Sequence, residues 1–549
     1  MKKHSTGALT KEQKAAQDKR YTQGHSYDYI IIGTGMSALS VGALLAHAGK
    51  KICMLEAHDV PGGMAHTFRM GDYEFCAQVH YIWGCAPGGR IYEFLRKIGL
   101  EKKITFQLLG PEGYDRMVMP DGKAVMIPYG FDELAKRIDT AYPGQRDAVL
   151  RFTKILSKIR TELRKLPDRK IKWWEYILNA HQFPTLLRYR TKTLQNVFDK
   201  CKLSKESQAV LIANAGDFMA PPKDLSIFAY CGLFGGYNNG AYYPTHHFKS
   251  LTQGLADFIT SRPGCHIYYE TAVSGIDIRE GNVGQVRTAD GKAFVADQYI
   301  CNMDPQTAAG MIGWQHFPAS WRKSLQYRYS PSGMMIYLGL KDIDLCEHGF
   351  GRFNTWHLLQ WDMNKMWDEQ GAMHFEKPWF FISTPSLHTN DHGTTPPGGA
   401  VMEIASYCEF DHWKELQQKD YSSYNKEKLK LADQLIDLVA TTYVPDLRKH
   451  IAVKTIGTPM THADFCNAPY GNAYGSYLDP KQIGTGRLKA VTPFNNLWWC
   501  NASSGFGGVH GTISTGMDLY MDLTGDRFFN NTTQPTDDEF VKQLRVGSR

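Results

Sequence analysis

The residues best placed to do chemistry form a glycine-rich turn near the amino terminus. Gly33, Gly35 and Ala38 follow directly on the apolar run 29–32. Two glycines permit a tight turn and let the backbone approach a pyrophosphate, and a small third residue allows close packing. Glu56 ends a second apolar run about twenty residues later, where its carboxylate would accept hydrogen bonds from a ribose diol. The spacing predicts a dinucleotide-binding turn rather than a plain glycine-rich loop.

Two strands and a helix must position these residues. The apolar runs 29–32 and 51–55 read as strands, and the periodic pattern 39–48 between them reads as a helix. Together they form a βαβ unit, which predicts an α/β fold. Met36 and Ser37 would open the helix, where unpaired N–H groups and the positive end of the helix dipole favour phosphate.

Further motifs give a family resemblance. The run 56–68, with Pro61, Gly62 and Gly63, resembles the extended motif of the flavin-dependent amine oxidase and phytoene desaturase superfamily. Segments 74–84, 237–244 and 495–516 resemble the retinol saturases, with their bacterial relatives, and the carotenoid isomerases. The likeness extends over nearly all of 27–525. It implies an α/β protein with a Rossmann-type FAD-binding domain, an inserted mixed-sheet substrate domain and a helical subdomain suited to membrane contact.

The resemblance implies FAD as the cofactor and assigns residues to it. The closing glycines 507–508 would face the flavin edge that becomes negative on reduction, and Val273 would meet the adenine through its backbone. The full set is Gly33, Gly35, Met36, Ser37, Ala38, Glu56, Ala57, Gly62, Gly63, Met64, Thr67, Val273, Gly507, Gly508 and Val509.

Four histidines are the predicted catalytic residues. His80 would lie near the flavin, and an imidazole with a pKa near 6.5 exchanges protons at neutral pH; a satisfied core histidine is the alternative. The family's usual Asp-x-Gly before this histidine is replaced here by 76–78, which leaves the reaction open. His246 and His247 stand where the family commonly has Gly-Gly, and could bind a head group, donate a proton or shape the pocket. His510, at a position that is often proline, could add positive charge beside the flavin.

No metal site is expected. Adjacent histidines point to opposite faces of a strand, so His246 and His247 cannot chelate one ion. The eleven cysteines are odd in number and lack C-x-x-C spacing, which fits a reducing compartment and argues against zinc or a disulfide scaffold.

Length and composition limit the architecture and the location. A chain of 549 residues exceeds what one core usually supports, so several domains are expected. Residues 1–26 are polar and basic without an apolar stretch, and no window is apolar enough to span a bilayer. We therefore expect a cytoplasmic protein without a signal peptide or transmembrane segment.

The predicted domain boundaries follow the motifs. The ends of the chain are a polar extension (1–26) and a polar, mobile tail (526–549). The FAD-binding domain comprises 27–110, 251–310 and 456–525, and the substrate and helical domain comprises 111–250 and 311–455.

One segment is strongly basic. Residues 151–192 hold twelve Lys and Arg against three acids, although the whole chain carries only +7. Tryptophans and leucines are interleaved, which suits peripheral contact with an anionic membrane. An ordinary solvated helix is the alternative, and nucleic acid is disfavoured because no recognised module accompanies the charge.

The predicted function is flavin redox chemistry at a carbon–carbon double bond of a long lipophilic polyene, such as a retinoid, a carotenoid or a polyunsaturated fatty acid. Saturation and isomerisation are favoured, with phytoene-type desaturation as the alternative. The chain holds one complete fingerprint and no second βαβ unit with its own acid. Electrons would therefore come from a separate donor, or the net reaction would be redox-neutral. The abundant aromatics and methionines of 356–367 suit either a lipid tunnel or an ordinary core. A flavin-free carrier of prenyl lipids is a distant alternative, because it would lack Glu56 or the glycine pairs.

Overall fold

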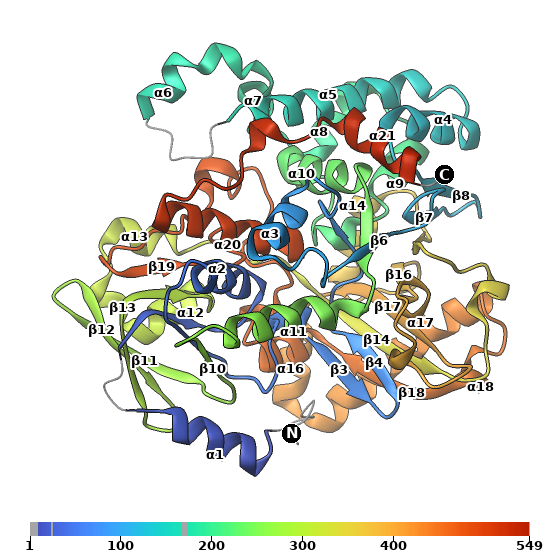
Figure 1. Ribbon diagram of the computed structural model, residues 1–549. Helices are drawn as coiled ribbons and strands as arrows, with labels where there is room; N and C mark the ends of the chain where they lie inside the picture. Colours follow the sequence, from blue (N-terminus) through green and yellow to red (C-terminus); the bar gives the residue numbers. More distant parts are fainter. Residues whose placement is uncertain (1–8, 23–25, 167–172, 548–549) are drawn as a thin grey trace.

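The computed structural model describes residues 9–22, 26–166 and 173–547. Two seven-stranded sheets lie side by side, and a layer of helices covers one end of both (Figure 1). The sheet built around the amino-terminal strand lies at the lower left of the view, and the second sheet lies at the lower right.

The first sheet is the predicted nucleotide-binding sheet. Its central strand β1 (Ser26–Ile32) lies parallel to β2 (Ile52–Leu55) and β13 (Ala293–Cys301). Ile30, Ile31 and Ile32 are buried, as expected for a parallel strand covered on both faces. The order is β10-β2-β1-β13-β12-β11, with β19 (Leu497–Trp499) paired to β13. The remaining strands are β10 (His266–Tyr268), β11 (Val273–Arg279) and β12 (Asn282–Thr288). This arrangement confirms the predicted α/β fold of Rossmann type.

Two helices from opposite ends of the chain cross closely on this sheet. They are α2 (Met36–His47) and α20 (Gly508–Thr524). A Cβ at Gly516 would lie 2.0 Å from the Ser40 Oγ, so only glycine permits the crossing. Helix α20 begins at Gly508, which puts Gly508, Val509 and His510 in its first turn.

The second sheet has the order β18-β14-β17-β16-β15-β7-β8 and is antiparallel except for β15 with β7. Strands β7 and β8 form a hairpin around the Asp121-Gly122 turn. The strands are β7 (Asp115–Val118), β8 (Ala124–Ile127), β14 (Ser332–Leu340), β15 (Asn354–Leu358), β16 (Trp379–Ser383), β17 (Ala400–Cys408) and β18 (Ile451–Gly457). The central strands are buried on both faces, so this sheet positions side chains in a dry interior.

The helical layer at the top of Figure 1 closes the space above both sheets. Its members used below are α5 (Arg146–Arg164), α6 (Trp173–Leu178), α7 (Pro184–Tyr189) and α10 (Ile227–Asn238). Within the described part of the chain, no helix is long and apolar enough to cross a membrane.

The carboxyl-terminal tail is not the loose end that its polar composition suggested. It forms helix α21 (Asp537–Gly547), which packs on the helical layer. Asp537 pairs with Arg160 at 2.8 Å and with Arg164, and Phe540 is buried. Through these contacts α21 is docked on the helical layer.

Candidate functional site

A cavity of about 740 Å³ lies between the two glycine turns. Its walls include residues 35–37 at the start of α2, residues 62–65, and residues 507–509 at the start of α20. The fold thus brings three predicted cofactor segments from distant parts of the sequence to one space. Its size falls in the range of about 300–1,000 Å³ that is usual for ligand sites.

The glycines of this wall form a cradle that side chains would fill. Gly62 pairs with Gly35 in a β-bridge, and a Cβ at Gly63 would lie 3.2 Å from the Gly35 Cα. Gly508 has φ +74°, and a Cβ there would meet no heavy atom within 4 Å, because it would project into the cavity. Backbone packed this closely around open space fits a flat flavin ring and a diphosphate.

Two helices begin at the cavity wall. Gly35 is the N-cap of α2 and Gly507 is the N-cap of α20, and neither helix has a side-chain cap. Uncapped N–H groups at a positive dipole end favour anions. The site can therefore hold phosphate at one helix and developing negative charge at the other.

Asn302 connects the start of α2 with the residue that follows β19, and sequence reasoning missed it. Its Oδ1 accepts from the Gly35 N–H at 2.9 Å, and its Nδ2 donates to the Ser37 Oγ at 2.8 Å and to the Cys500 carbonyl at 2.6 Å. It follows directly on β13, and ligands of parallel sheets bind at the carboxyl ends of strands. That rule, applied to the predicted strand, is the signal that would have found it.

Arg487 is a second residue that the sequence did not reveal. Its buried guanidinium donates to the carbonyls of Gly505 and Ala502, at 2.5 and 2.6 Å, and to that of Ser476 at 3.1 Å. These bonds fix the loop that leads into α20 and so set the position of the closing glycines.

The remaining predicted cofactor residues lie outside the cavity wall: Gly33, Ala38, Glu56, Ala57, Thr67 and Val273. The Glu56 carboxylate accepts from the N–H groups of Thr34 at 2.7 Å and His58 at 2.8 Å, which holds it beside the phosphate turn. The Thr271 N–H donates to the Glu56 carbonyl at 2.7 Å and brings the start of β11, with Val273, to the same place.

His80 lies in the wall of the cavity, paired with an acid. Its Nδ1 is 3.0 Å from the Oε2 of Glu403, a fully buried side chain on β17. Burial raises the pKa of Glu403, and the hydrogen bond from His80 opposes that rise. This partner could not be predicted from local patterns, because Glu403 lies in an apolar strand more than 300 residues away.

His510 also lines the cavity, but it does not add positive charge. Its ring stacks on Trp83 with 4.3 Å between centroids. Burial, with further contributions from Arg90 and Arg160, lowers the pKa of His510 to about 3. The imidazole is therefore neutral at neutral pH, and the expectation of a cation there was wrong.

His246 and His247 do not belong to the cavity wall, which corrects their predicted placement in the site. The backbone turns at His247, with φ +62°, so that His246 points to solvent and His247 is buried. The His247 N–H donates to the Thr389 Oγ1 at 3.1 Å, and burial lowers the pKa of the ring to about 4.

One part of the cavity wall is apolar and follows α10, and we call this part the apolar branch. Its lining follows one face of that helix, at the spacing expected for a continuous stripe. The stripe comprises Phe228, Ala229, Gly232, Leu233 and Gly236, and Phe540 of α21 lies in the same wall. A smaller cavity of about 60 Å³ shares His80 and Asp217 with the first and is lined by Trp356 and Trp379.

Most of the aromatic and methionine-rich segment 356–367 lies in the core. Trp356 lines the smaller cavity, whereas Met363, Met366 and Trp367 are buried in the core and line neither cavity. Among residues 9–22, 26–166 and 173–547, no three His, Cys, Asp or Glu side chains are grouped to hold a metal ion.

Comparison with known proteins agrees with this geometry. Residues 36–371 match the family model described as flavin containing amine oxidoreductase. An all-trans-retinol 13,14-reductase of Danio rerio is 23% identical over 516 residues, which cover 86% of this chain and 81% of the relative. A chloroplastic prolycopene isomerase of Daucus carota is 23% identical over 518 residues, which cover 90% and 78%.

Solved structures show the same fold. Wild-type putrescine oxidase bound to putrescine superposes with a TM-score of 0.61 at 12% identity, covering 91% of this chain and 99% of that one. An oxidoreductase from Methanosarcina mazei has a TM-score of 0.59 at 13% identity, with coverages of 89% and 99%. At this identity the likeness concerns the fold alone.

Proposed function

The chain belongs to the flavin containing amine oxidoreductase family, and from this premise we propose that it binds FAD and acts on a carbon–carbon double bond of a long polyene lipid. Saturation or isomerisation is the favoured reaction. The two kinds of curated relative, a retinol 13,14-reductase and prolycopene isomerases, are named for these two reactions.

One observation carries the proposal: a single cavity joins the glycine cradle to an apolar branch along α10. A conjugated chain extended along Phe228, Leu233 and Phe540 would reach the wall formed by residues 507–509. Its apolar surface would be removed from water, at about 25 cal/mol per Å². An elongated lipid fits this shape better than a small polar amine does.

Each part of the cradle has a role in holding the cofactor. The start of α2 would bind the diphosphate, Glu56 the ribose, and Gly62 and Gly63 the adjoining part of the cofactor. When bound, the flavin supplies two-electron transfer to or from carbon. The first turn of α20 would stabilise negative charge on the ring through its N–H groups. The apolar walls exclude water, and His80 with Glu403 forms a proton-exchanging pair in the wall.

The electron source is a further part of the proposal. Because the sequence has one dinucleotide fingerprint, a nicotinamide cofactor has no second site of that kind. Saturation would then draw electrons from a separate donor, and isomerisation would need none on balance.

Product analysis tests the proposal. Flavin-loaded protein, oxidised or photoreduced, is incubated with a retinoid, a carotenoid and a polyunsaturated fatty acid in turn. We expect one of these classes to gain two hydrogens or to change double-bond geometry, detected by chromatography and mass spectrometry. Loss of two hydrogens would favour desaturation. Flavin-loaded protein that leaves all three unchanged would refute the proposal, and colourless protein that retains lipid would support the carrier function.

A matched pair of glycine variants connects the product to the cradle. Gly508→Leu places a side chain in the cavity, so we expect loss of bound flavin and of product. Gly99→Leu is the control, because Gly99 has the same φ of +74° and equally open surroundings but caps helix α3 (Arg90–Ile98) away from the cavity. Flavin retained by Gly508→Leu would place the ring elsewhere.

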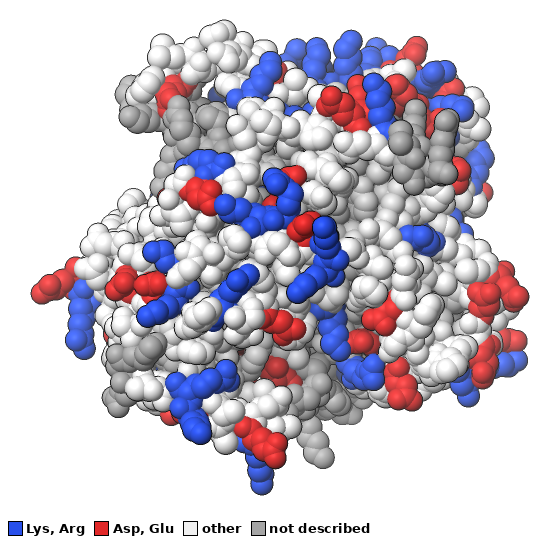
Figure 2. All heavy atoms as spheres, in the orientation of Figure 1, with Lys and Arg blue, Asp and Glu red and all other residues white. Residues whose placement is uncertain are grey.

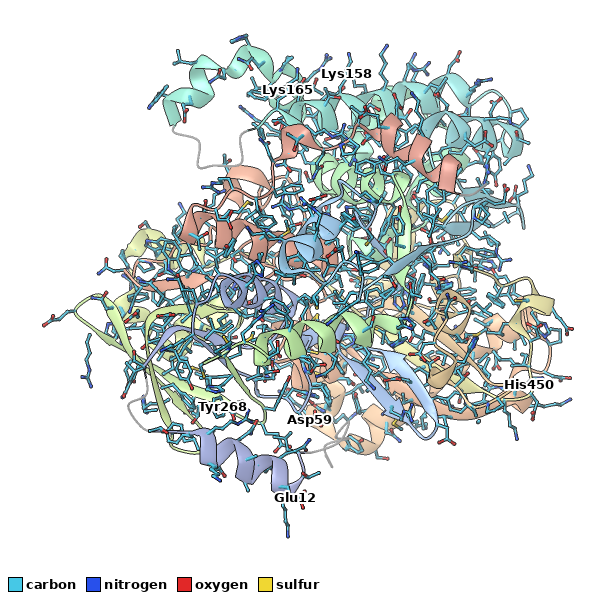
Figure 3. The ribbon with its side chains drawn as sticks, viewed as in Figure 1. Glu12, Asp59, Lys158, Lys165, Tyr268 and His450 are labelled. Carbon is cyan, nitrogen blue, oxygen red and sulfur yellow. The ribbon has the colours of Figure 1, made fainter. Side chains whose placement is uncertain are left out.

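We also propose that the helical layer contacts an anionic membrane. The exposed bases of α5 are Arg146, Arg151, Lys154 and Lys158, and the exposed Lys165 directly follows the helix. The last three of these and Arg151 are at the spacing of one helix face. Lys and Arg side chains gather along this upper edge in Figure 2, and Figure 3 labels Lys158 and Lys165 there. Trp174, Leu178 and Leu187 of the neighbouring α6 and α7 are 44–66% exposed.

Not every basic residue of segment 151–192 belongs to the exposed face. Arg160 and Arg164 pair with Asp537 and do not belong to the exposed face. Residues 169, 170 and 172, which contributed to the predicted charge, lie outside the described residues. The exposed apolar side chains beside the α5 bases still form the pattern of an interfacial surface.

A further inference from the structure

Two carboxyls and one phenol meet at the wall of the cavity. The Tyr81 hydroxyl oxygen lies 2.6 Å from the Oδ2 of Asp217 and 3.1 Å from the Oδ2 of Asp115. Asp115 is buried and lines neither cavity, Tyr81 and Asp217 both line the main cavity, and of the three only Asp217 also lines the smaller one. Asp115 begins β7 and Asp217 ends the short helix Ala215–Asp217, so the cluster joins three distant segments.

This arrangement requires one proton more than the hydroxyl provides. A phenol has a single proton and can donate it to only one of the two carboxyl oxygens. The other carboxyl oxygen would face the phenol lone pairs without a hydrogen between them. One of the two carboxyls must therefore be protonated, and it then donates to the Tyr81 oxygen.

The surroundings favour the protonated form. Burial, followed by the charge of Asp217, raises the pKa of Asp115 well above its ordinary value. Burial also raises the pKa of Asp217 to about 6, although hydrogen bonds from Tyr81 and Asn214 oppose the rise. Because the two groups interact, their titration belongs to the pair.

The groups that face the pair are mostly uncharged. Tyr237 stacks on Tyr81 with 4.1 Å between ring centroids, the Tyr114 ring lies 6.4 Å away, and the Asn214 Nδ2 donates to Asp217 at 3.1 Å. Tyr474 of the opposite wall contacts the neighbouring Gly216 carbonyl at 3.5 Å. In the part of the chain that the structure describes, no Lys or Arg pairs with either carboxyl. His80 is the one titratable cation whose charge acts on Asp217, and when protonated it favours the carboxylate.

We propose that Asp115, Tyr81 and Asp217 hold one proton in common and that Asp217, which faces the cavity, donates this proton to a carbon of the bound substrate. The inference rests on the proposed function, since it names the acid of that reaction. Asp217 is then a catalytic residue, and Tyr81 and Asp115 are the residues that supply its proton.

The step balances for a saturation. The O–H bond of Asp217 breaks while the π electrons of the substrate double bond form the new C–H bond. The neighbouring carbon would take up a hydride, and a reduced flavin held in the glycine cradle would supply its two electrons. Before this step the shared proton reaches Asp217, because the Tyr81 hydroxyl proton passes to the Asp217 carboxylate while the Asp115 proton passes to the Tyr81 oxygen. After the donation both carboxyls are ionised. Solvent finally reprotonates Asp115. In an isomerisation the same proton is added and removed.

Infrared difference spectroscopy tests the shared proton in flavin-loaded protein without substrate. We expect a protonated-carboxyl C=O band that persists above the ordinary carboxyl pKa and disappears in Asp115→Asn and in Asp217→Asn. Asp121→Asn is the matched control, because Asp121 also accepts from a tyrosine, Tyr142 at 3.1 Å, but lies on the β7–β8 turn. A band that survives in both Asp115→Asn and Asp217→Asn overturns the proposal.

Turnover of the substrate class found by product analysis provides the second readout. We expect Asp217→Asn to lower turnover by about 100-fold or more, as removal of a general acid does. In D₂O, the wild-type product should carry one solvent deuterium. Tyr81→Phe keeps both carboxyl groups but removes the hydroxyl through which the proton passes between them. The infrared band should therefore remain while turnover falls. This variant replaces Asp217→Asn in the test if Asp217→Asn does not fold.

The two proposals fail in different ways. Full turnover by Asp217→Asn overturns the assignment of the acid and leaves the proposed function intact. Wild-type protein that converts no polyene refutes the proposed function, and the infrared band still decides whether the proton is shared.

Discussion

At the scale of single residues, the chemistry of the site depends on pairs that join distant parts of the chain. His80 was predicted from the family resemblance of residues 74–84, but its contact with Glu403 comes from the second sheet. A protonated imidazole beside a buried carboxyl group favours the ionised carboxylate, and the carboxylate favours the protonated imidazole. The pair therefore connects stability to pH.

We expect His80→Gln to make stability more sensitive to pH. Burial raises the pKa of Glu403 above its ordinary value of 4.5, and His80 opposes the rise. A raised carboxyl pKa means that the folded state binds more protons than the unfolded state, so stability falls as the pH rises above 4.5. Without the imidazole the pKa rises further, at a cost of about 1.4 kcal/mol for each unit.

Thermal melts across the pH range measure this effect. Glu403→Gln should flatten the pH dependence, because it removes the titrating group. His450→Gln is a suitable control, since His450 lies at the far right edge of Figure 3 and its Nδ1 is 3.0 Å from the Lys341 carbonyl. Identical pH slopes for wild type and His80→Gln would show that the pair is not coupled.

At the scale of elements, helix α21 completes the apolar branch of the cavity. Asp537 receives two hydrogen bonds of 2.8 Å from Arg160 and one of 2.7 Å from Asn239, and Phe540 lies in the cavity wall. Burial alone would raise the pKa of Asp537, but Arg160 and Arg164 outweigh it and hold the pKa at about 2. Docking of α21 is therefore fully present above the ordinary carboxyl pKa and weakens as the pH falls toward 2.

We expect Asp537→Asn to release this helix. Breaking one partner of a largely buried ion pair costs about 3 kcal/mol, because Arg160 is left without its counterion. Limited proteolysis should then remove the tail, and the affinity for a long polyene should fall while flavin remains bound. The neighbouring Asp538→Asn, which changes an exposed side chain, should do neither. A tail that stays protected in Asp537→Asn would mean that packing of Phe540 is enough to hold it.

At the scale of the whole molecule, basic and apolar side chains are exposed together on the helical layer. That layer also contains α5 and α10, which line the apolar branch of the cavity. A lipid leaving a membrane on this side would have a short path to the branch. We therefore connect the membrane surface with substrate entry.

Flotation with liposomes tests this surface. Binding should require anionic lipid and weaken with salt, because the screening length falls to about 8 Å at physiological ionic strength. Trp174→Ala combined with Leu178→Ala should lower the bound fraction by about tenfold. Trp314→Ala is the control, because Trp314 is 38% exposed on another part of the surface. Equal flotation of the two variants, or none at low salt, would argue against this contact.

The sequence alone was sufficient for the features that depend on short-range spacing. The glycine turn, its helix and Glu56 lie within one βαβ unit, and residue type alone sets their backbone geometry: only glycine readily adopts φ +99° at position 33 or φ +113° at position 62. The Rossmann-type fold and the flavin family were predicted in this way and are confirmed.

Only the tertiary structure decided which side chains face the cavity and in which charge state. The structure places His246 and His247 outside the site because of one backbone turn. Burial beside Arg90 and Arg160 lowers the pKa of His510, so its ring is not the cation that was expected. Sheet register and long-range packing bring other side chains to the site, namely Glu403, Asn302 and the cluster of Tyr81, Asp115 and Asp217. Backbone turns are local and are encoded locally, whereas electrostatic environments are sums over neighbours that the chain meets only when it is folded.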